Sequence, residues 1–330
     1  MKVTEVPDPQ AVPGEVLVKV AACGVCRTDL EYLKEGMRPM KPYPLIFGHE
    51  VSGTVAALGE GVKGPAVGQR VVVAFTLPCG QCRMCQDGRE NACSRAQIVG
   101  ASRDGGFAQY VAVPVSTLHA LPPSLPLEES CVLTDAVATA YHALVEVAGA
   151  RPGDTLAIFG ATGGLGLAAV QIASALGCWV IAVGRQPHKL ERARELGAAV
   201  TLSTLEVKEI DREVNRLTQG GVDISLETSG VPALMTMACQ ATRPGGKIVI
   251  AGFTLKRFEV PTNRLMWLEQ AVLGSRTYRP RDLGRVISMA ERGMVDPKKL
   301  VSHRFPLAEI NEAYLKLEEG QLARGIVIPK

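Results

Sequence analysis

Four of the nine cysteines in this chain of 330 residues lie in one short segment, at Cys79, Cys82, Cys85 and Cys93. Four thiolates on one loop match the tetrahedral shell of structural zinc, which leaves no coordination position open for chemistry. The odd number of cysteines and their uneven spacing argue against a disulfide framework. A cysteine ribbon can also serve nucleic-acid or protein recognition, but this one lacks a basic patch. We therefore predict a structural zinc site.

Cys26 and His49 are candidates for a zinc site of a second kind. A catalytic zinc ion takes three protein ligands and keeps one position open for a substrate. Taken singly, however, each residue also fits a purely structural role: Cys26 as a small buried thiol and His49 as a histidine of the core. The residue pattern alone does not pair them.

A glycine-rich turn predicts a dinucleotide site. The segment Thr155–Phe159 has the composition of a strand, GATGGLG follows at 160–166, and a helical pattern begins there. Glycines permit a tight turn and close approach to a pyrophosphate, and a helix N-terminus offers free N–H groups. The alternative is a turn without a ligand, but the strand–turn–helix context favours a dinucleotide. The residues expected to contact the cofactor are Gly160, Gly163, Gly164, Leu165 and Gly166.

The end of the next strand indicates which nicotinamide cofactor is used. An acidic residue there would bond the ribose 2′-hydroxyl of NAD, whereas an arginine would accommodate the 2′-phosphate of NADP. The sequence has Gly184, Arg185 and then Lys189, without a carboxylate. We expect Gly184 to leave room where an NAD enzyme places its carboxylate, and NADP to be favoured over NAD. The alternative is that Arg185 and Lys189 merely begin a solvated helix.

Two kinds of pattern indicate the elements that position these groups. Residues 14–74 read as antiparallel β structure, with Gly and Pro between the strands Glu15–Val20, Val51–Val55 and Gln69–Ala74. Residues 155–251 alternate strands with the helices Leu165–Leu176 and Lys189–Leu196, the second ending at Gly197. This alternation predicts an α/β, doubly wound parallel (Rossmann) sheet. Its expected strands are Thr155–Phe159, Trp179–Val183, Ala199–Leu202, Asp223–Glu227 and Lys247–Ala251, with Ala271–Gly274 as a sixth candidate.

The composition excludes several classes of protein. Hydrophobic residues make up 47% and charged residues 21%, which is ordinary for a globular chain. The net charge of +3 is too small to indicate a nucleic-acid or membrane partner. The first residues lack the apolar stretch of a signal peptide, and no run of about 18 apolar residues stands out. We therefore expect a cytoplasmic protein with no membrane partner.

Taken together, the motifs resemble those of the medium-chain, zinc-containing alcohol dehydrogenase family. They are GVCRTD at 24–29, GHE at 48–50, the four-cysteine loop, the glycine turn, RFPL at 304–307, INEA at 310–313 and RGIV at 324–327. The resemblance covers nearly the whole chain. It implies a mostly antiparallel β catalytic domain of residues 1–134 and 271–330, interrupted by a dinucleotide-binding domain of residues 135–270. It also implies zinc-dependent hydride transfer between a nicotinamide cofactor and an alcohol or carbonyl substrate.

The resemblance also assigns roles to residues around the catalytic zinc ion. Cys26 and His49 would be ligands, and Glu50 would sit behind the metal and ligate it transiently. Asp29 would orient the imidazole of His49. Thr28 would hydrogen-bond the substrate oxygen and take up the proton of an alcohol whose pKa the zinc ion lowers.

Three more residues would shape the substrate and cofactor sites. Phe75 would form a wall of the substrate pocket. Arg27 and Arg324 would reach the pyrophosphate of the cofactor.

The sequence departs from the family in three places. Asp135 stands where many members have a cysteine as third zinc ligand, and we prefer it because a carboxylate is an acceptable zinc ligand. Cys131 is near, but it lies roughly one helical turn from the matching position. Glu31 stands where many members have a histidine that passes the proton to solvent, so the proton relay must end differently. The strand that usually precedes the Val3–Pro7 segment is missing, either because the start is shorter here or because the true start lies upstream.

Two alternative functions remain to be separated from this one. A zinc-free quinone or enoyl reductase of the same superfamily would use the same coenzyme domain, but Cys26, His49 and the cysteine loop speak against it. A non-enzymatic zinc-binding adaptor is at odds with an intact glycine turn.

The partners we expect are a small-molecule alcohol, aldehyde or ketone and further copies of the chain. A homodimer, or a tetramer built from dimers, is expected from the family. The apolar segment Leu265–Leu273 near a sheet edge also favours association, since an unpaired edge strand is usually covered or paired.

Overall fold

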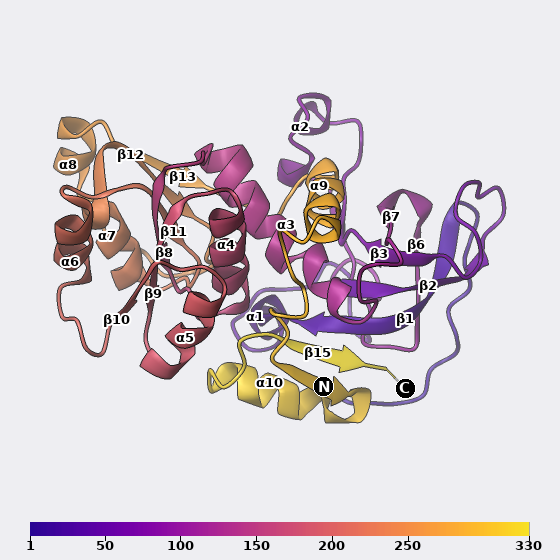
Figure 1. Ribbon diagram of the computed structural model, residues 1–330. Coiled ribbons are helices and arrows are strands. Elements are labelled where there is room, and N and C mark those ends of the chain that lie inside the picture. The colour runs from indigo at the N-terminus through magenta and orange to yellow at the C-terminus, as the bar shows by residue number, and fades with distance from the viewer. Residues whose placement is uncertain (330) are drawn as a thin grey trace. The chain divides into compact units, whose positions relative to one another are not determined.

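The computed structural model describes residues 1–329, and the chain divides into two compact units (Figure 1). The first unit comprises Met1–Ala138 and the chain from Arg279 onward, and the second comprises Thr139–Tyr278. Both boundaries fall later than the expected 134/135 and 270/271. The first lies within helix α3 (Ala136–Tyr141), and the second is displaced because β13 (Ala271–Gly274) pairs with a strand of the second unit.

A seven-stranded, mostly antiparallel sheet forms the frame of the first unit. Its order is β14-β15-β1-β2-β3-β7, and β6 pairs with β1; only β14 and β15 run parallel to each other. Val16, Val18 and Val20 alternate on the buried face of β1, as expected of a half-buried strand. The strands are β1 (Glu15–Val25), β2 (Glu50–Leu58), β3 (Arg70–Val73), β6 (Tyr110–Pro114), β7 (Leu118–Ala120), β14 (His303–Pro306) and β15 (Gly325–Ile328).

Short elements complete the first unit. A two-stranded sheet of β4 (Thr76–Leu77) and β5 (Gln97–Ile98) stands apart from the large one. Single turns of 3-10 helix cover Glu90–Ala92, Val115–Thr117 and Leu307–Glu309, and a longer one covers Glu129–Thr134. The α-helices are α1 (Arg27–Leu33), α2 (Arg83–Gln86), α9 (Pro280–Glu291) and α10 (Ile310–Glu318).

The second unit contains the predicted parallel sheet, with six strands in the order β10-β9-β8-β11-β12-β13. All its pairings are parallel, and the direction of strand order reverses between β8 and β11, where doubly wound sheets bind their ligands. The strands other than β13 are β8 (Thr155–Phe159), β9 (Trp179–Gly184), β10 (Val200–Ser203), β11 (Val222–Glu227) and β12 (Thr242–Ile250).

Helices on this sheet bury its apolar side chains. Phe159, Ile181 and Val183 from the strands share one core cluster with Ile210 and Val214 from α6. The predicted end of α5 is also present: Gly197 follows it at φ +110°, a backbone conformation that favours glycine. The helices are α4 (Gly164–Ala175), α5 (Pro187–Glu195), α6 (Ile210–Thr218), α7 (Pro232–Ala241) and α8 (Thr262–Trp267), with a π-helical segment at His142–Ala148.

One helical stretch, Glu129–Ala148, is long and apolar enough to cross a membrane by length and composition alone, which inspection of the sequence had not revealed. Its 20 residues contain an 18-residue window with a mean hydropathy of 1.3, of which 78% is buried within the structure. Such burial is usual for a helix of a protein core, so the stretch is weak evidence for a membrane span.

Candidate metal and cofactor sites

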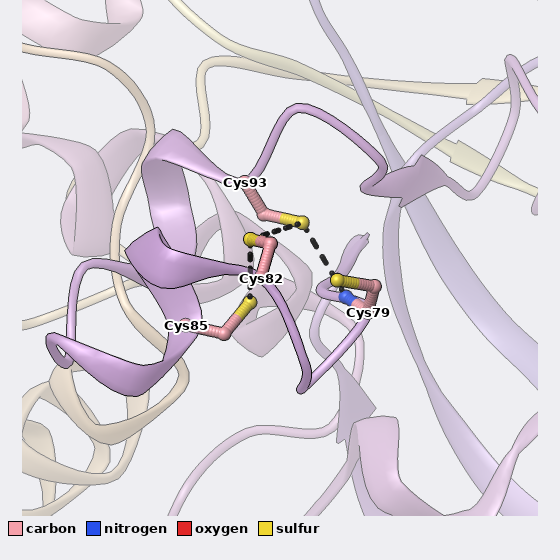
Figure 2. Close-up of side chains that lie close together, drawn as sticks. All are labelled: Cys79, Cys82, Cys85 and Cys93. Atoms are coloured by element: carbon pink, nitrogen blue, oxygen red, sulfur yellow. Dashed lines mark hydrogen bonds between the residues drawn. The ribbon is translucent and has the colours of Figure 1, made fainter.

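The four predicted cysteines converge at one point of the first unit (Figure 2). The Sγ atom of Cys82 lies 3.6 Å from that of Cys85 and 3.7 Å from that of Cys93, and the backbone N–H of Cys79 donates to Cys93 Sγ at 3.4 Å. Four sulfurs at about 2.3 Å from a central zinc ion would be about 3.8 Å apart. Sulfurs in a disulfide would be about 2.05 Å apart. The four thiols therefore fit a zinc ion.

The local fold explains why these cysteines meet. All four lie in the loop that joins β4 to β5, and the pairing of Thr76 with Ile98 closes the base of that loop. Within it, Cys82 caps the N-terminus of the short helix α2, which carries Cys85. The loop thus brings its thiols together through local structure, as a structural metal site requires.

The thiols of the four-cysteine loop differ in pKa. A backbone hydrogen bond from Gln81 lowers the pKa of the Cys79 thiol to about 6. Loss of solvation, followed by the neighbouring Cys82, raises the pKa of Cys85 to about 12. When a metal cation binds such a group, it displaces the thiol protons into solvent, because the thiolate is the form that ligates metal.

A second group of donors lies at one end of the β1–β2 pair. One ligand atom from each of Cys26, His49, Glu50 and Asp135 falls within 4.8 Å of the others. Asp135 Oδ2 lies 3.4 Å from Cys26 Sγ and 3.5 Å from His49 Nε2. Donors of a tetrahedral zinc site with sulfur, nitrogen and oxygen ligands are about 3.3–3.6 Å apart. Cys26, His49 and Asp135 therefore fit one zinc ion with a fourth position left over.

Three elements supply these donors. Cys26 follows β1 and caps the N-terminus of α1, and His49 immediately precedes β2. The antiparallel register places Gly24 opposite Glu50, so the two ligands lie at the same end of the strand pair. Asp135 stands at the end of the 3-10 helix Glu129–Thr134, where α3 begins. The chain thus needs its tertiary fold to bring Asp135 to the other two.

Glu50 has a different environment from the three donors. Its Oε1 accepts a hydrogen bond from Arg324 and lies 3.9 Å from His49 Nε2, and its Oε2 is buried with no hydrogen-bond partner among residues 1–329. Burial raises the pKa of Glu50 to about 8, although the charge of Arg324 opposes the shift. Cys131 is fully buried and belongs to neither donor group found within residues 1–329. The geometry therefore favours Asp135 as third donor.

His49 is held from its other ring nitrogen. Its Nδ1 lies 3.5 Å from Oδ1 of Asp29, and the second carboxylate oxygen of Asp29 accepts a hydrogen bond from Tyr314. Burial alone would lower the pKa of His49, but the charges of Asp29 and Cys26 raise it well above its usual range. For Asp135 the order is the same: burial opposes ionisation, but the hydrogen bond and charge of His49 prevail and lower its pKa.

Sequence inspection did not single out Tyr314. The signal was present in α10, where Ile310, Ala313 and Tyr314 are buried with helical spacing. A hydroxyl on the buried face of a helix must find a partner there. The sequence alone gave no indication that this partner is Asp29.

Thr28 and Phe75 both lie beside the donors. Thr28 Oγ1 is 3.6 Å from Cys26 Sγ, and the Phe75 ring is 5.1 Å from the His49 ring. Glu31 is buried about one helical turn after Thr28 in α1. Its burial, and next the charge of Glu35, raise its pKa to about 7. A hydroxyl and an aromatic wall thus flank the donor group.

The two arginines assigned to the pyrophosphate have distinct surroundings. Arg27 is exposed and pairs with Glu35 at 2.9 Å. Arg324 is 6% exposed, pairs with Glu50 and lies 3.9 Å from Asp135 Oδ2. Arg324 therefore places its positive charge beside the carboxyl groups of Glu50 and Asp135.

In the second unit, the glycine turn lies where the strand order reverses. Gly163 caps the N-terminus of α4, and Gly164, Leu165 and Gly166 form its first turn, where backbone N–H groups have no helical partner. A Cβ atom on Gly166 would lie only 2.2 Å from the carbonyl oxygen of Gly160, so the turn is compact enough to require glycine. This arrangement fits a pyrophosphate.

The expectation that Gly184 leaves open space is wrong. A Cβ atom there would lie 2.7 Å from Cγ2 of Thr162 and 2.9 Å from Cδ2 of Leu190, because α5 packs onto the end of β9. The adjacent Arg185 is exposed, and its carbonyl accepts a hydrogen bond from Ser203 at 2.9 Å. Burial, followed by the charge of Arg185, lowers the pKa of Lys189. Two cationic side chains therefore lie close together at this end of the sheet.

Comparison with known proteins places the chain in a family. The family described as "Alcohol dehydrogenase GroES-like domain" matches residues 12–123, and "Zinc-binding dehydrogenase" matches residues 164–292. An alcohol dehydrogenase of Geobacillus stearothermophilus is 36% identical over 99% of this chain and 95% of its own length.

Solved structures agree with these matches. An NAD-dependent alcohol dehydrogenase has a TM-score of 0.93 and 32% identity, covering 99% of this chain and 95% of its own. A structure described as a zinc-binding dehydrogenase from Sinorhizobium meliloti 1021 bound to NADP has a TM-score of 0.91 and 31% identity, covering 98% and 94% of the two chains. With these matches the chain belongs to the medium-chain, zinc-containing alcohol dehydrogenase family, whose members carry out zinc-dependent oxidoreduction of alcohols.

Proposed function

We propose that Cys26, His49 and Asp135 hold the catalytic zinc ion of this dehydrogenase, and that the four-cysteine loop holds a second, structural one. The observation that carries the proposal is the convergence of a thiol, an imidazole and a carboxylate from three places in the chain, with Asp135 Oδ2 at 3.4 Å from the Cys26 thiol and 3.5 Å from the His49 imidazole. Such a set leaves one zinc position for an alcohol or carbonyl oxygen.

The residues around this site each have a part in the reaction. When bound, the zinc ion supplies a Lewis acid and the nicotinamide ring supplies or accepts the hydride. Thr28, beside Cys26, would accept the proton of the substrate hydroxyl while its own hydroxyl proton passes on toward solvent, and the two transfers would run in the opposite sense in the reverse reaction. Phe75, buried against His49, keeps water from this side of the substrate. Small alcohols, aldehydes and ketones are the substrates that we expect.

We further propose that the cofactor is NADP, held at the glycine turn and at Arg185 and Lys189. The support is the pair of cations at the end of β9, together with the NADP-bound relative. Because Gly184 is closely packed, replacing it with aspartate would disturb the fold as well as the charge. Removing the cation is the cleaner change.

The test compares titrations of NADPH and NADH. We expect the unchanged protein to bind NADPH more tightly, and Arg185→Ala to weaken NADPH binding roughly ten- to a hundredfold while changing NADH little. Arg212→Ala, an exposed change on α6, is the matched control. Tighter binding of NADH by the unchanged protein would show that Arg185 only begins a solvated helix.

The protein is also proposed to assemble as a homodimer or a tetramer of dimers and to work in the cytoplasm. Support for assembly comes from β13, an edge strand of the parallel sheet, and from α8, where Met266 is 69% and Trp267 80% exposed. Edge strands and exposed apolar side chains of this kind are usually covered.

A further inference from the structure

A buried polar chain leads away from the proposed catalytic zinc site to a residue outside every motif of the sequence. His49, Asp29 and Tyr314 are 5%, 1% and 5% exposed. His49 immediately precedes β2, Asp29 lies in α1 and Tyr314 lies in α10. This series of polar side chains therefore links residues from the two ends of the sequence within the first unit.

The atoms in this chain have a definite order. His49 Nε2 faces Oδ2 of Asp135 at 3.5 Å, and Nδ1 faces Oδ1 of Asp29 at 3.5 Å. The Tyr314 hydroxyl donates to Oδ2, the other oxygen of the Asp29 carboxylate. Oδ1 is buried and has no other hydrogen-bond partner within the described residues, so it remains available to the imidazole N–H.

The Tyr314 ring and its hydroxyl have separable roles. The ring packs edge-on against Phe107 with centroids 6.1 Å apart, and this packing would survive replacement by phenylalanine. The hydroxyl has one partner, Asp29. Burial, followed by the charge of Asp29, raises the pKa of Tyr314 well above its usual range, so the hydroxyl keeps the proton that it donates.

We propose that Tyr314 is a positioning residue for the metal centre, because its hydroxyl fixes the Asp29 carboxylate that orients His49. The inference rests on the proposed role of His49 as a zinc ligand. Without the hydroxyl, Asp29 can rotate about its side-chain torsions and share its charge between both oxygens. His49 then loses the partner that selects its tautomer and ring orientation.

The loss of the Tyr314 hydroxyl should first lower the affinity of the site for zinc, and any change in turnover should follow from that. Partners that directly hold a metal-ligating histidine are worth about 10–100-fold in metal affinity. Tyr314 acts one hydrogen bond further away, so Tyr314→Phe is expected to weaken zinc binding at this site by roughly three- to tenfold. The four-cysteine site should be unaffected.

The experiment measures zinc affinity by competition with a chelator in the full-length protein. Tyr314→Phe is compared with Tyr110→Phe, a matched control on β6, and His49→Ala identifies which zinc ion belongs to the catalytic site. Cobalt(II) exchanged into that site supplies a second readout, since its visible absorption band responds to ligand geometry. We expect Tyr314→Phe to lower the affinity and shift the band, and Tyr110→Phe to do neither.

A second comparison tests whether the Tyr314 hydroxyl acts through Asp29. With Asp29→Ala in place, adding Tyr314→Phe should change the zinc affinity no further, because the hydroxyl acts only through Asp29. Unchanged affinity and spectrum in Tyr314→Phe would overturn the proposal, as would an additional loss in the double variant. Failure of the function itself looks different: His49→Ala would then release no zinc from the protein.

Discussion

At the proposed catalytic zinc site, Asp135 would stand in for a cysteine without changing the charge of that site. A thiolate from Cys26 and a carboxylate from Asp135 bring two negative charges to a divalent cation, as two thiolates would. Glu50 is neutralised separately by Arg324. Because an uncompensated buried charge is costly, this balance favours a carboxylate at the position where the family resemblance implies a cysteine.

The residue types in the sequence predicted which side chains form the candidate sites better than they predicted the packing and ion pairs around those side chains. The structure brings together Cys26, His49 and Asp135, which the motifs had identified. The close packing at Gly184 and the pairing of Arg324 with Glu50 were not foreseen. Both depend on side chains that are distant in sequence, such as Thr162 beside Gly184 and Glu50 beside Arg324, and only the fold determines these contacts.

Glu31 predicts a pH dependence of stability. Its side chain is 4% exposed, and burial together with Glu35 raises its pKa from 4.5 to about 7. The folded state therefore keeps a proton that the unfolded state has lost between these values. This contribution to stability is full below pH 4.5 and declines as the pH rises to 7, by at most about 3 kcal/mol.

The neutral variant Glu31→Gln should accordingly be more stable than the unchanged protein at pH 8 and similar to it at pH 5. Urea unfolding at the two pH values measures the difference. Glu195→Gln, at an exposed position on α5, serves as control. A stability gain of the same size at both pH values would show that the Glu31 carboxyl does not titrate in this way.

Among the elements, the alternating pattern predicted the parallel sheet well. Strand β8 was predicted at its observed bounds, and β13, the sixth candidate, completes the sheet. Strand β12 begins at Thr242, earlier than the predicted Lys247. The prediction started the strand too late because Pro244 and the two glycines after it resemble a turn. They are accommodated by a register shift opposite β11. Helix α1 has only seven residues, too few to give a helical period.

The turn between β8 and α4 gives a prediction about its glycines. A methyl group on Gly166 would collide with backbone atoms of Gly160 and Ala161, whereas the nearest atom to one on Gly163 is 3.6 Å away. We expect Gly166→Ala to lower the free energy of unfolding by about 1–3 kcal/mol. Gly163→Ala should lower it by less, about 0.5–1 kcal/mol, because the added methyl group has space and only the N-cap preference for glycine is lost.

Both variants should weaken cofactor binding, since either methyl group lies at the turn that approaches the pyrophosphate. Chemical denaturation and NADPH titration separate the two effects. Equal losses of stability in the two variants would be inconsistent with the packing of this turn.

For the whole molecule, the first unit is built from both ends of the chain. Strand β1 pairs with β15, and α10 supplies Tyr314 to the hydrogen-bonded group beside the proposed ligand His49. The sequence suggested that the chain returns to this unit through the closing family motifs. It could not give the point of return, because β13 is the last strand of the other sheet and only its pairing reveals this.

Assembly is predicted at this scale. Light scattering at micromolar concentration should give a mass of two or four times the 35.1 kDa of one chain. The edge of β13 and the exposed Trp267 are the features that association would cover. A mass of 35.1 kDa at that concentration would contradict the proposed homodimer or tetramer.

The most direct test of the proposed zinc chemistry is metal content measured together with turnover. The unchanged protein is predicted to hold two zinc ions per chain and to oxidise an alcohol with NADP. Cys26→Ala should keep its fold and one zinc ion but lose turnover. Cys82→Ser should instead lose stability, because a structural site contributes folding free energy directly. Full activity of Cys26→Ala would contradict the account.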